Sequence, residues 1–164
     1  MSEARTDDAG SETLQVRVAT VADSDAFVRF NRAMALETEN KKLDETVVAP
    51  GVAAVFANPA RGFYVVAERA DDIIAALMVT FEWSDWRNAN FWWIQSVYVV
   101  PEFRRRGLYR RLYDFVRERA RREGGVCGFR LYVEKSNVTA QRVYESLGMS
   151  VSDYVMYEER VDRE

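Results

Sequence analysis

A short basic loop, followed at once by a helix-type sequence, is the part of this chain best suited to bind an anionic ligand. The segment Val97–Tyr109 reads VYVVPEFRRRGLY, a strand-like run, a proline and three consecutive arginines before Gly107. The first N–H groups of a helix have no partner inside the helix, and the helix dipole adds partial positive charge there. Gly107 allows close backbone approach because it has no Cβ atom. The segment therefore predicts a pyrophosphate site formed by backbone amides.

The distribution of charge agrees with this interpretation. Residues 102–123 carry nine arginines against four acidic residues, a local balance of +5, although the whole chain has a net charge of -3. The alternative for the later arginines is a solvated helix surface with ion pairs one turn apart. For Arg104, Arg105 and Arg106 the ligand-binding interpretation is favoured.

A second group of polar residues recurs at helical spacing further along the chain. Asn137, Gln141 and Tyr144 lie at i, i+4 and i+7, which places them on one face of a helix. Asn137 is suited to cap the start of that helix. A tyrosine at this spacing is by itself most typical of a core aromatic. The residues alone therefore leave a structural role and a ligand-binding role open.

The composition restricts the proton chemistry that is available. The chain has 164 residues, no histidine and one cysteine. Ser-His-Asp and Cys-His pairs are excluded, and so are zinc sites with histidine ligands and disulfides within the chain. Proton transfer near neutral pH must then use a carboxylate, a tyrosine, a lysine, a chain amine or water.

The basic loop resembles the coenzyme loop of the GCN5-related N-acetyltransferase (GNAT) superfamily. That loop reads Arg or Gln, two residues, Gly, one residue, then Gly or Ala. Arg104 and Gly107 match it, and Tyr109 stands where the last small residue is usual. The segment NVTAQRVYESLGM, residues 137–149, is similar to a second signature of the family. The resemblance covers roughly residues 14–159 and implies a GNAT-like fold, with acetyl-CoA as acyl donor and no metal.

The resemblance also implies which residues contact the coenzyme. In the family the pantetheine arm pairs, as an extra strand, with a splayed or bulged strand, here the segment 95–99. Backbone N–H groups of that strand are expected to stabilise the oxyanion of the tetrahedral intermediate. The implied coenzyme contacts are Val97, Val99, Arg104, Arg105, Arg106, Gly107, Tyr109, Asn137 and Tyr144.

A further implication of the family is that the Tyr144 hydroxyl lies near the coenzyme sulfur. In acetyl transfer to an amine, the amine attacks the thioester carbonyl directly and the thiolate leaves. A thiol pKa of ~8.5 lies below a tyrosine pKa of ~10, so proton transfer from tyrosine to the thiolate is only modestly uphill. We therefore expect Tyr144 to act as the general acid, without any histidine.

The base that deprotonates the acceptor is left open by the residues. A primary ammonium has a pKa near ~10.4 and must lose a proton before it attacks. The candidates are Glu37, Glu39, Glu82, Asp85 and ordered water. Glu37 and Glu39 end the first helical region, which lines the acceptor site in the family.

The tryptophans are concentrated in one segment that could contact the acceptor. Trp83, Trp86, Trp92 and Trp93 are the only tryptophans of the chain. Packing in the core or at a dimer interface is favoured for at least half of them, and an aromatic wall that attracts a cationic amine is the alternative. We expect a small-molecule amine as acceptor and a homodimer. Acetylation of a peptide or protein amine and a non-catalytic acyl-CoA-binding module are the competing hypotheses.

The elements that position these residues follow from hydrophobic periodicity and turn signals. Strands are expected over 14–19, 63–67, 73–83, 91–100, 128–133 and 151–159, and helices over 22–36, 44–57, 108–122 and 137–147. The second helix is expected to be capped by Asp44. The resulting order, β-α-α-β-β-β-α-β-α-β, predicts an α/β fold with a mixed sheet covered by helices.

Composition and charge set the broad class of protein. With 48% hydrophobic residues the chain can form a core, and one domain is expected over 13–164 after a disordered tail over 1–12. The net charge of -3 argues against nucleic-acid binding. No apolar run approaches the ~20 residues of a membrane-spanning helix, so no membrane partner is expected. Since residues 1–12 lack a signal-peptide pattern, a cytoplasmic location is expected.

Overall fold

The structure, a computed structural model, describes residues 13–161. These residues form two compact units, the first ending at Tyr132 and the second beginning at Val133. Within them, the first unit contains a five-stranded sheet and three α-helices, and the second contains one α-helix. No helix in the described range is both long and apolar enough to cross a membrane. The single domain expected over 13–164 stays a prediction.

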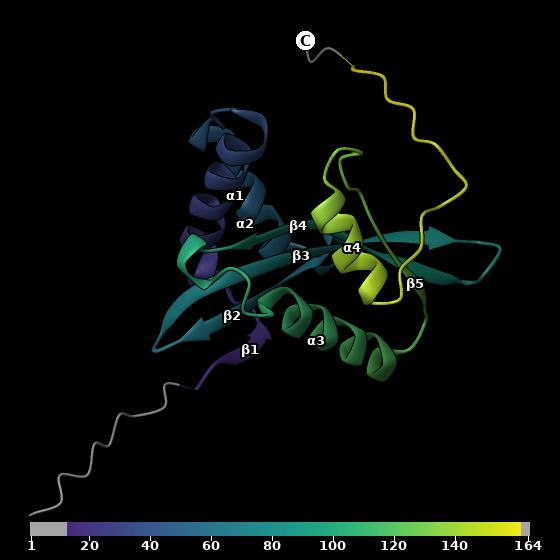
Figure 1. The fold of residues 1–164 in the computed structure, drawn as a ribbon, viewed down its shortest axis with the longest axis horizontal. Coiled ribbons are helices and arrows are strands. Elements are labelled where there is room, and N and C mark those ends of the chain that lie inside the picture. The colour runs from purple at the N-terminus through teal and green to yellow at the C-terminus, as the bar shows by residue number, and fades with distance from the viewer. Residues whose placement is uncertain (1–12, 162–164) are drawn as a thin grey trace, which may run out of the picture. The chain divides into compact units, whose positions relative to one another are not determined.

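One mixed sheet organises the first unit (Figure 1). Its strands lie side by side in chain order: β1 (Gln15–Val18), β2 (Phe63–Arg69), β3 (Asp72–Ser84), β4 (Ala89–Val99) and β5 (Val126–Leu131). Neighbouring strands are antiparallel from β1 to β4, and β5 is parallel to β4. Ala70 and Asp71 connect β2 to β3 with positive φ angles of 51° and 66°, as a type I′ hairpin turn requires.

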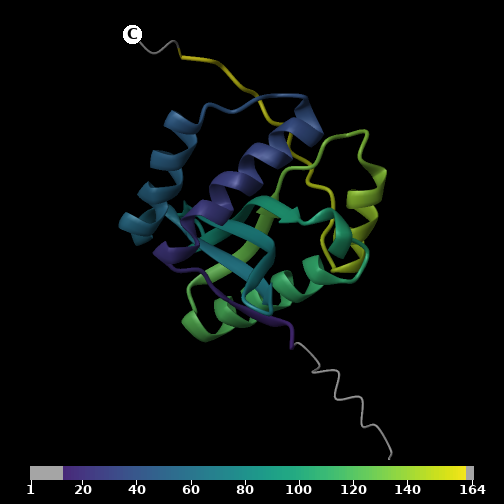
Figure 2. The same cartoon turned by 90° about the vertical axis from the view of Figure 1, so that its left-hand side faces the viewer.

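Helices cover both faces of this sheet (Figure 2). They are α1 (Ser24–Glu39), α2 (Glu45–Ala57) and α3 (Leu108–Glu123). On one face Phe27 of α1 stacks on Tyr64 of β2, with ring centroids 4.0 Å apart, in a core shared with α2. Leu112 and Val116 of α3 are fully buried on the other face. Successive strand residues point to opposite faces of a sheet. Val65, which follows Tyr64, therefore points to the α3 side, and it is fully buried there.

Local signals in the sequence account for the ends of these elements. Asp44 Oδ1 accepts a hydrogen bond from the Thr46 N–H at 2.9 Å, which confirms Asp44 as the cap of α2. Asn40 ends α1 in the left-handed region, with φ 49°, a conformation that asparagine tolerates better than most residues. Gly62 precedes β2, and a Cβ atom there would lie 2.0 Å from the Val79 carbonyl oxygen. Only glycine therefore permits this approach to β3.

The mixed α/β fold expected from the sequence is confirmed, with the expected element order up to α4 (Val138–Ser146). The strand expected over 151–159 is wrong, because residues 149–161 form no helix or strand. Apolar residues at strand-like spacing do not make a strand unless a neighbour pairs with its backbone. Val151, Tyr154 and Tyr157 are accordingly exposed. The tail expected over 1–12 lies outside the described residues.

Candidate active site

The last part of β4 presents an open backbone edge. β4 pairs with β5 from Asn90–Val126 to Ile94–Leu131, whereas its pairing with β3 continues to Val99. The two parallel strands therefore part after Ile94. Among the described residues, the segment 95–99 pairs with no strand on its β5 side.

Two N–H groups point to this open edge. The Val100 N–H donates to the Ile74 carbonyl of the β3 side at 2.9 Å. Because successive N–H groups along a strand point to opposite edges, those of Val99 and Val97 point away from β3. The Val99 carbonyl, which shares the direction of its N–H, accepts instead from Arg104 Nε at 2.9 Å. An extended amide-bearing ligand can pair with β4 at this edge, at the two positions that the family resemblance implies.

A β-bulge interrupts β4 just before the open edge. Met78 lies opposite Ser96, but the next residue, Val79, lies opposite Ile94, so Gln95 is the extra residue. The Gln95 side chain donates to Thr80 Oγ1 at 2.8 Å, across to β3. The bulged strand expected over this segment is confirmed. A bulge bends its strand and re-aims the groups beside it.

The loop after β4 turns twice through the left-handed region before α3 begins. Arg105 has a φ angle of 62° and Gly107 one of 73°. α3 starts at Leu108, and its first helical hydrogen bond runs from the Arg111 N–H to the Gly107 carbonyl at 3.2 Å. The earlier N–H groups of the first turn have no partner within the helix. The loop thus has the form of an anion site built from backbone.

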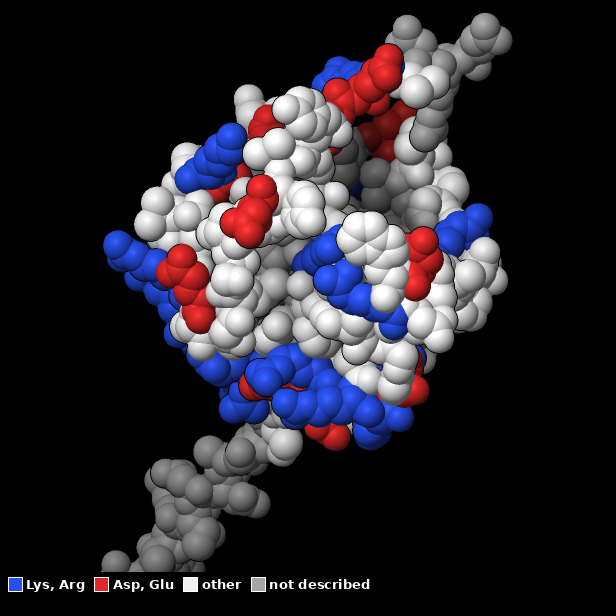
Figure 3. Space-filling view, turned by 90° about the vertical axis from the view of Figure 1, so that its right-hand side faces the viewer, with Lys and Arg blue, Asp and Glu red and all other residues white. Residues whose placement is uncertain are grey.

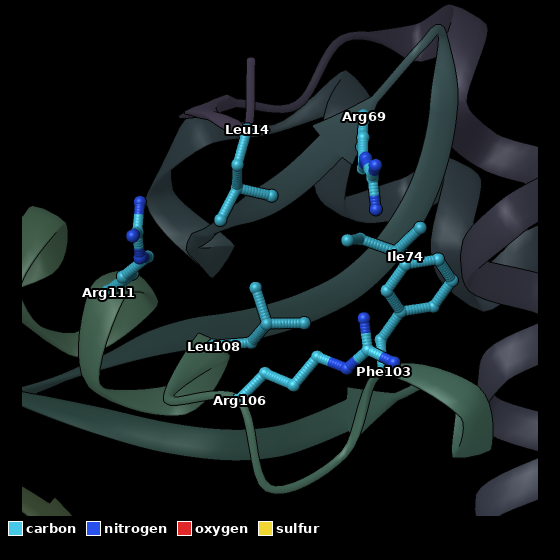
Figure 4. Close-up of a pocket in the computed structure, with 7 residues that line it drawn as sticks. All are labelled: Leu14, Arg69, Ile74, Phe103, Arg106, Leu108 and Arg111. Atoms are coloured by element: carbon cyan, nitrogen blue, oxygen red, sulfur yellow. The ribbon is translucent and has the colours of Figure 1, made fainter. Parts of the chain in front are cut away.

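The three loop arginines have different roles in the structure. Arg104 donates to the Glu37 carboxylate at 2.7 Å, as well as to the Val99 carbonyl, so its side chain links the end of α1 to the end of β4. Arg106 lies over the Phe103 ring, 5.4 Å from its centroid, and lines a cavity (Figure 4). Arg105 is exposed. The three side chains therefore lie in different surroundings, and their contacts with the coenzyme stay predictions.

Further arginines of α3 form ion pairs along the helix. Figure 3 shows basic side chains gathered over the lower part of the face it presents, at the height of α3 in Figure 1. Arg117 pairs with Asp114 at 3.6 Å, and Arg121 with Glu118 at 3.7 Å. Arg119 pairs with Glu123 at 2.5 Å. These pairs are the solvated helix surface that was the alternative interpretation for the later arginines.

The candidate base Glu37 is held by two donors. Arg104 binds one of its carboxylate oxygens, and the Tyr98 hydroxyl donates to the other at 3.0 Å. The hydrogen bond from Arg104, with a smaller contribution from Tyr98, keeps the pKa of the Glu37 carboxyl below its ordinary value. A carboxylate with a lowered pKa is a weaker base. Glu39, two residues on, is exposed at the end of α1.

Glu82 belongs to a different group, on β3 opposite Phe91 of β4. Its carboxylate accepts from Trp93 Nε1 and, at 2.7 Å, from Arg130. Arg130 lies over the Phe91 ring, 3.6 Å from its centroid, and Trp93 packs against Tyr132 at 4.5 Å between ring centroids. Arg130 and Tyr132 were not candidates from the sequence. The signal for them is a charged and an aromatic side chain two residues apart, in β5 and directly after it.

The four tryptophans lie in different surroundings. Trp92 lies in the core, with 3% of its surface exposed, but Trp83 and Trp86 are exposed at 59% and 89%. Asp85, in the same hairpin turn, accepts from the backbone N–H of Trp86 at 2.8 Å. Trp93 alone combines partial burial with a hydrogen bond to a candidate base. It is the tryptophan best placed to line an acceptor site.

The second unit carries the two remaining candidates. Asn137 Oδ1 accepts from the Ala140 N–H at 3.0 Å, which confirms Asn137 as the cap of α4. Tyr144 is half-buried on α4, and burial raises the pKa of its hydroxyl. A raised pKa keeps a tyrosine protonated at neutral pH, as a general acid requires. The position of its hydroxyl at the coenzyme sulfur stays a prediction.

Comparison with known proteins assigns this arrangement to a class. The sequence profile of the Acetyltransferase (GNAT) family matches residues 25–149. A solved structure described as "a possible acetyltransferase from Clostridium difficile 630" is 43% identical and superposes with a TM-score of 0.86, over 93% of this chain and 100% of that one. The fold and its sequence thus define an acetyltransferase. The chain belongs to the GNAT family.

More distant solved structures share the fold. One is the aminoglycoside N-acetyltransferase AAC(6')-Iy in complex with CoA, with 12% identity and a TM-score of 0.70 over 90% of this chain and 95% of that chain. Another is a ribosomal-protein-alanine N-acetyltransferase from Brucella melitensis biovar Abortus 2308, with 13% identity and a TM-score of 0.71 over 91% of this chain and 100% of that chain. Because these two proteins act on different acceptors, the shared fold does not select an acceptor.

Proposed function

We propose that this protein transfers the acetyl group of acetyl-CoA to a primary amine of a small molecule. The observation that carries the proposal is the open edge of β4 at Val97 and Val99, which runs directly into the Gly107 loop. The backbone offers N–H donors first along the strand edge and then at the start of α3. A ligand with amide groups along an extended arm and a pyrophosphate at the end of that arm matches these donors. Acetyl-CoA is such a ligand, and GNAT membership supports it as the donor.

The proposed reaction needs only groups that this chain contains. The acceptor nitrogen forms a bond to the thioester carbonyl carbon, and backbone N–H groups of the 95–99 segment stabilise the oxygen that becomes negative. The carbon–sulfur bond then breaks. Tyr144 gives its proton to the leaving thiolate and regains one from solvent. The acceptor ammonium loses one proton before it attacks, and its nitrogen loses a second proton once it is bonded to the carbonyl carbon. No histidine or metal takes part.

Water is the acceptor base that the contacts favour. The pKa of Glu37 is lowered by Arg104, and both oxygens of Glu82 already accept hydrogen bonds. Each carboxylate is therefore better suited to orient a cationic acceptor than to remove its proton. Glu39 is the carboxylate alternative, since it is exposed beside the same helix end.

The aromatic and acidic face around Glu82 supports a small cationic acceptor. Trp93 and Tyr132 present aromatic surface next to the Glu82 carboxylate, an arrangement that attracts an alkylammonium ion. We also propose a homodimer, which light scattering of the purified protein tests.

A panel of acceptors tests the proposed function. Acetyl-CoA is supplied with small mono- and polyamines, aminoglycosides, amino acids and peptides with free N-termini, and release of free CoA is measured with a thiol reagent. Turnover of small amines above the rate with water alone is expected. Faster turnover of peptides would favour the peptide-acetylating alternative. Coenzyme binding without turnover of any acceptor would favour the non-catalytic module.

A further inference from the structure

A small cavity beside the coenzyme loop is lined by arginines from three different elements (Figure 4). Its volume is about 180 Å³. Arg69 is the last residue of β2, Arg106 lies in the loop before α3, and Arg111 lies in the first turn of α3. In Figure 4, Arg106 reaches past Leu108 toward Phe103, while Arg69 points to the same region from above. Positive side chains that are distant in sequence therefore surround one cavity.

Among the residues that the structure describes, those lining the cavity carry positive charge. The seven include three arginines and no aspartate or glutamate. Glu68, which precedes Arg69, binds Arg17 at 2.6 Å. Within residues 13–161, neither Arg106 nor Arg111 forms an ion pair. Guanidinium groups gathered in this way raise the local positive potential, so the cavity is suited to an anion.

The remaining walls of the cavity are apolar. Leu14, Ile74, Phe103 and Leu108 complete the lining. An occupant therefore needs an anionic end for the arginines and a small apolar body for these side chains. Ligand pockets for whole drug-sized molecules are typically about 300–1,000 Å³, so a cavity of about 180 Å³ takes a group rather than a complete nucleotide.

We propose that this cavity binds a phosphate monoester. A monoester carries about -1.5 to -2 charges at neutral pH and three acceptor oxygens, whereas a carboxylate carries one charge and two oxygens. Guanidinium groups bind phosphate oxygens in pairs, and three of them line this cavity. Two sources offer this chemistry. One is the 3′-phosphate of the coenzyme, which rests on the proposed function, and the other is a separate small phosphorylated molecule.

The test uses the coenzyme and one small probe. Calorimetry measures binding of CoA, dephospho-CoA and phenyl phosphate to the wild-type protein and to Arg69→Ala, Arg111→Ala and Arg111→Lys. Arg122→Ala is the matched control, because Arg122 lies at the other end of α3 and does not line the cavity. Far-ultraviolet circular dichroism verifies that each variant is folded.

Loss of charge at the cavity is expected to weaken binding of the phosphate. We expect Arg69→Ala and Arg111→Ala each to weaken phenyl phosphate by about tenfold or more, since hydrogen bonds to charged groups are involved, while Arg122→Ala changes little. Arg111→Lys retains the charge but not the paired hydrogen bonds and gives an intermediate loss.

Competition identifies the source. If CoA displaces phenyl phosphate, and Arg111→Ala removes a preference for CoA over dephospho-CoA, the occupant is the coenzyme phosphate. If phenyl phosphate stays bound beside CoA, the occupant is a separate molecule. Absence of phenyl phosphate binding together with equal CoA and dephospho-CoA affinities in all proteins would overturn the proposal. Failure of CoA to bind at all would count against the proposed function, while the phenyl phosphate measurement still reports on the cavity.

Discussion

Arg104 and Glu37 join the segment after β4 to the C-terminal end of α1 through a hydrogen bond of 2.7 Å between charged groups. The same guanidinium binds the Val99 carbonyl at the open edge of β4. Arg104 thereby stands between the open edge of β4, where we propose that the coenzyme binds, and the end of the helix that carries Glu37. Its side chain holds the end of β4 to the end of α1, and its contact with the coenzyme stays a prediction.

The Arg104–Glu37 pair predicts a pH-dependent contribution to stability. Because the pKa of Glu37 is lowered in the folded protein, its contribution is present above the unfolded pKa of ~4.3 and is lost as pH falls through the lower folded pKa. Both side chains are partly exposed, so we expect Glu37→Gln to cost about 0.5–1 kcal/mol at pH 7. Urea unfolding between pH 7 and pH 3 measures this. In an Arg104→Ala background the same substitution should lose its pH-dependent cost, and an unchanged cost there would contradict the assignment.

Amide hydrogen exchange rates should alternate between successive residues along the open edge of β4. We expect the amides of Val97 and Val99 to exchange faster than those of Tyr98 and Val100 in the free protein, since only the latter two point toward β3. Addition of CoA should protect Val97 and Val99 selectively. Amide exchange followed by nuclear magnetic resonance resolves the four positions. Equal protection of all four without CoA would show that the edge is already paired.

Removal of the Tyr144 hydroxyl should affect chemistry more than binding. We expect Tyr144→Phe to lower kcat by about 100-fold, in the range of general acid catalysis, with little change in the Kd of CoA. Kinetics on an acceptor from the panel and calorimetry with CoA provide the two measurements. Tyr157→Phe, at a position 91% exposed, is the matched control. Wild-type turnover in Tyr144→Phe would remove the assigned role.

The charge of Glu82 should affect the acceptor rather than the coenzyme. Glu82→Gln leaves Arg130 without its carboxylate partner, so the face becomes more positive and attracts an ammonium ion less. We expect the KM of a cationic acceptor to rise about tenfold, a change in uniform binding, with kcat nearly unchanged. Asp85→Asn makes the same charge change in the hairpin turn. An equal effect of both substitutions would indicate long-range electrostatics instead of a specific site.

Substitution of glycine by alanine should have opposite effects on stability at two positions. Gly62→Ala places a Cβ atom 2.0 Å from the Val79 carbonyl oxygen at a φ of +140°, and we expect a loss of about 3 kcal/mol or more. Gly51→Ala, inside α2 with no atom within 4 Å of the added Cβ, should stabilise the protein by about 0.5–1 kcal/mol. Urea unfolding of both variants tests the pair. Equal stability of the two variants would contradict the close approach of Gly62 to β3.

Local rules account for the elements that could be predicted from the sequence. Aromatic and β-branched residues predict the long strand β4. Asp44 and Asn137 cap their helices as expected, because such signals act within a few residues. The segment 151–159 has the local pattern of a strand but does not form one. Its residues have strand-like spacing, but a strand also requires a partner that spacing cannot supply.

The sequence by itself determined the family and the loop before α3, because these depend on short motifs, and the family resemblance implied the bulge in β4. Only the tertiary structure decided what the charged side chains do. It ties Arg104 to Glu37, joins Arg130 and Trp93 to Glu82, and gathers Arg69, Arg106 and Arg111 around one cavity. The physical reason is that each of these contacts joins side chains from different elements, which only folding brings together. A long flexible arginine then binds the partner that lies within its reach.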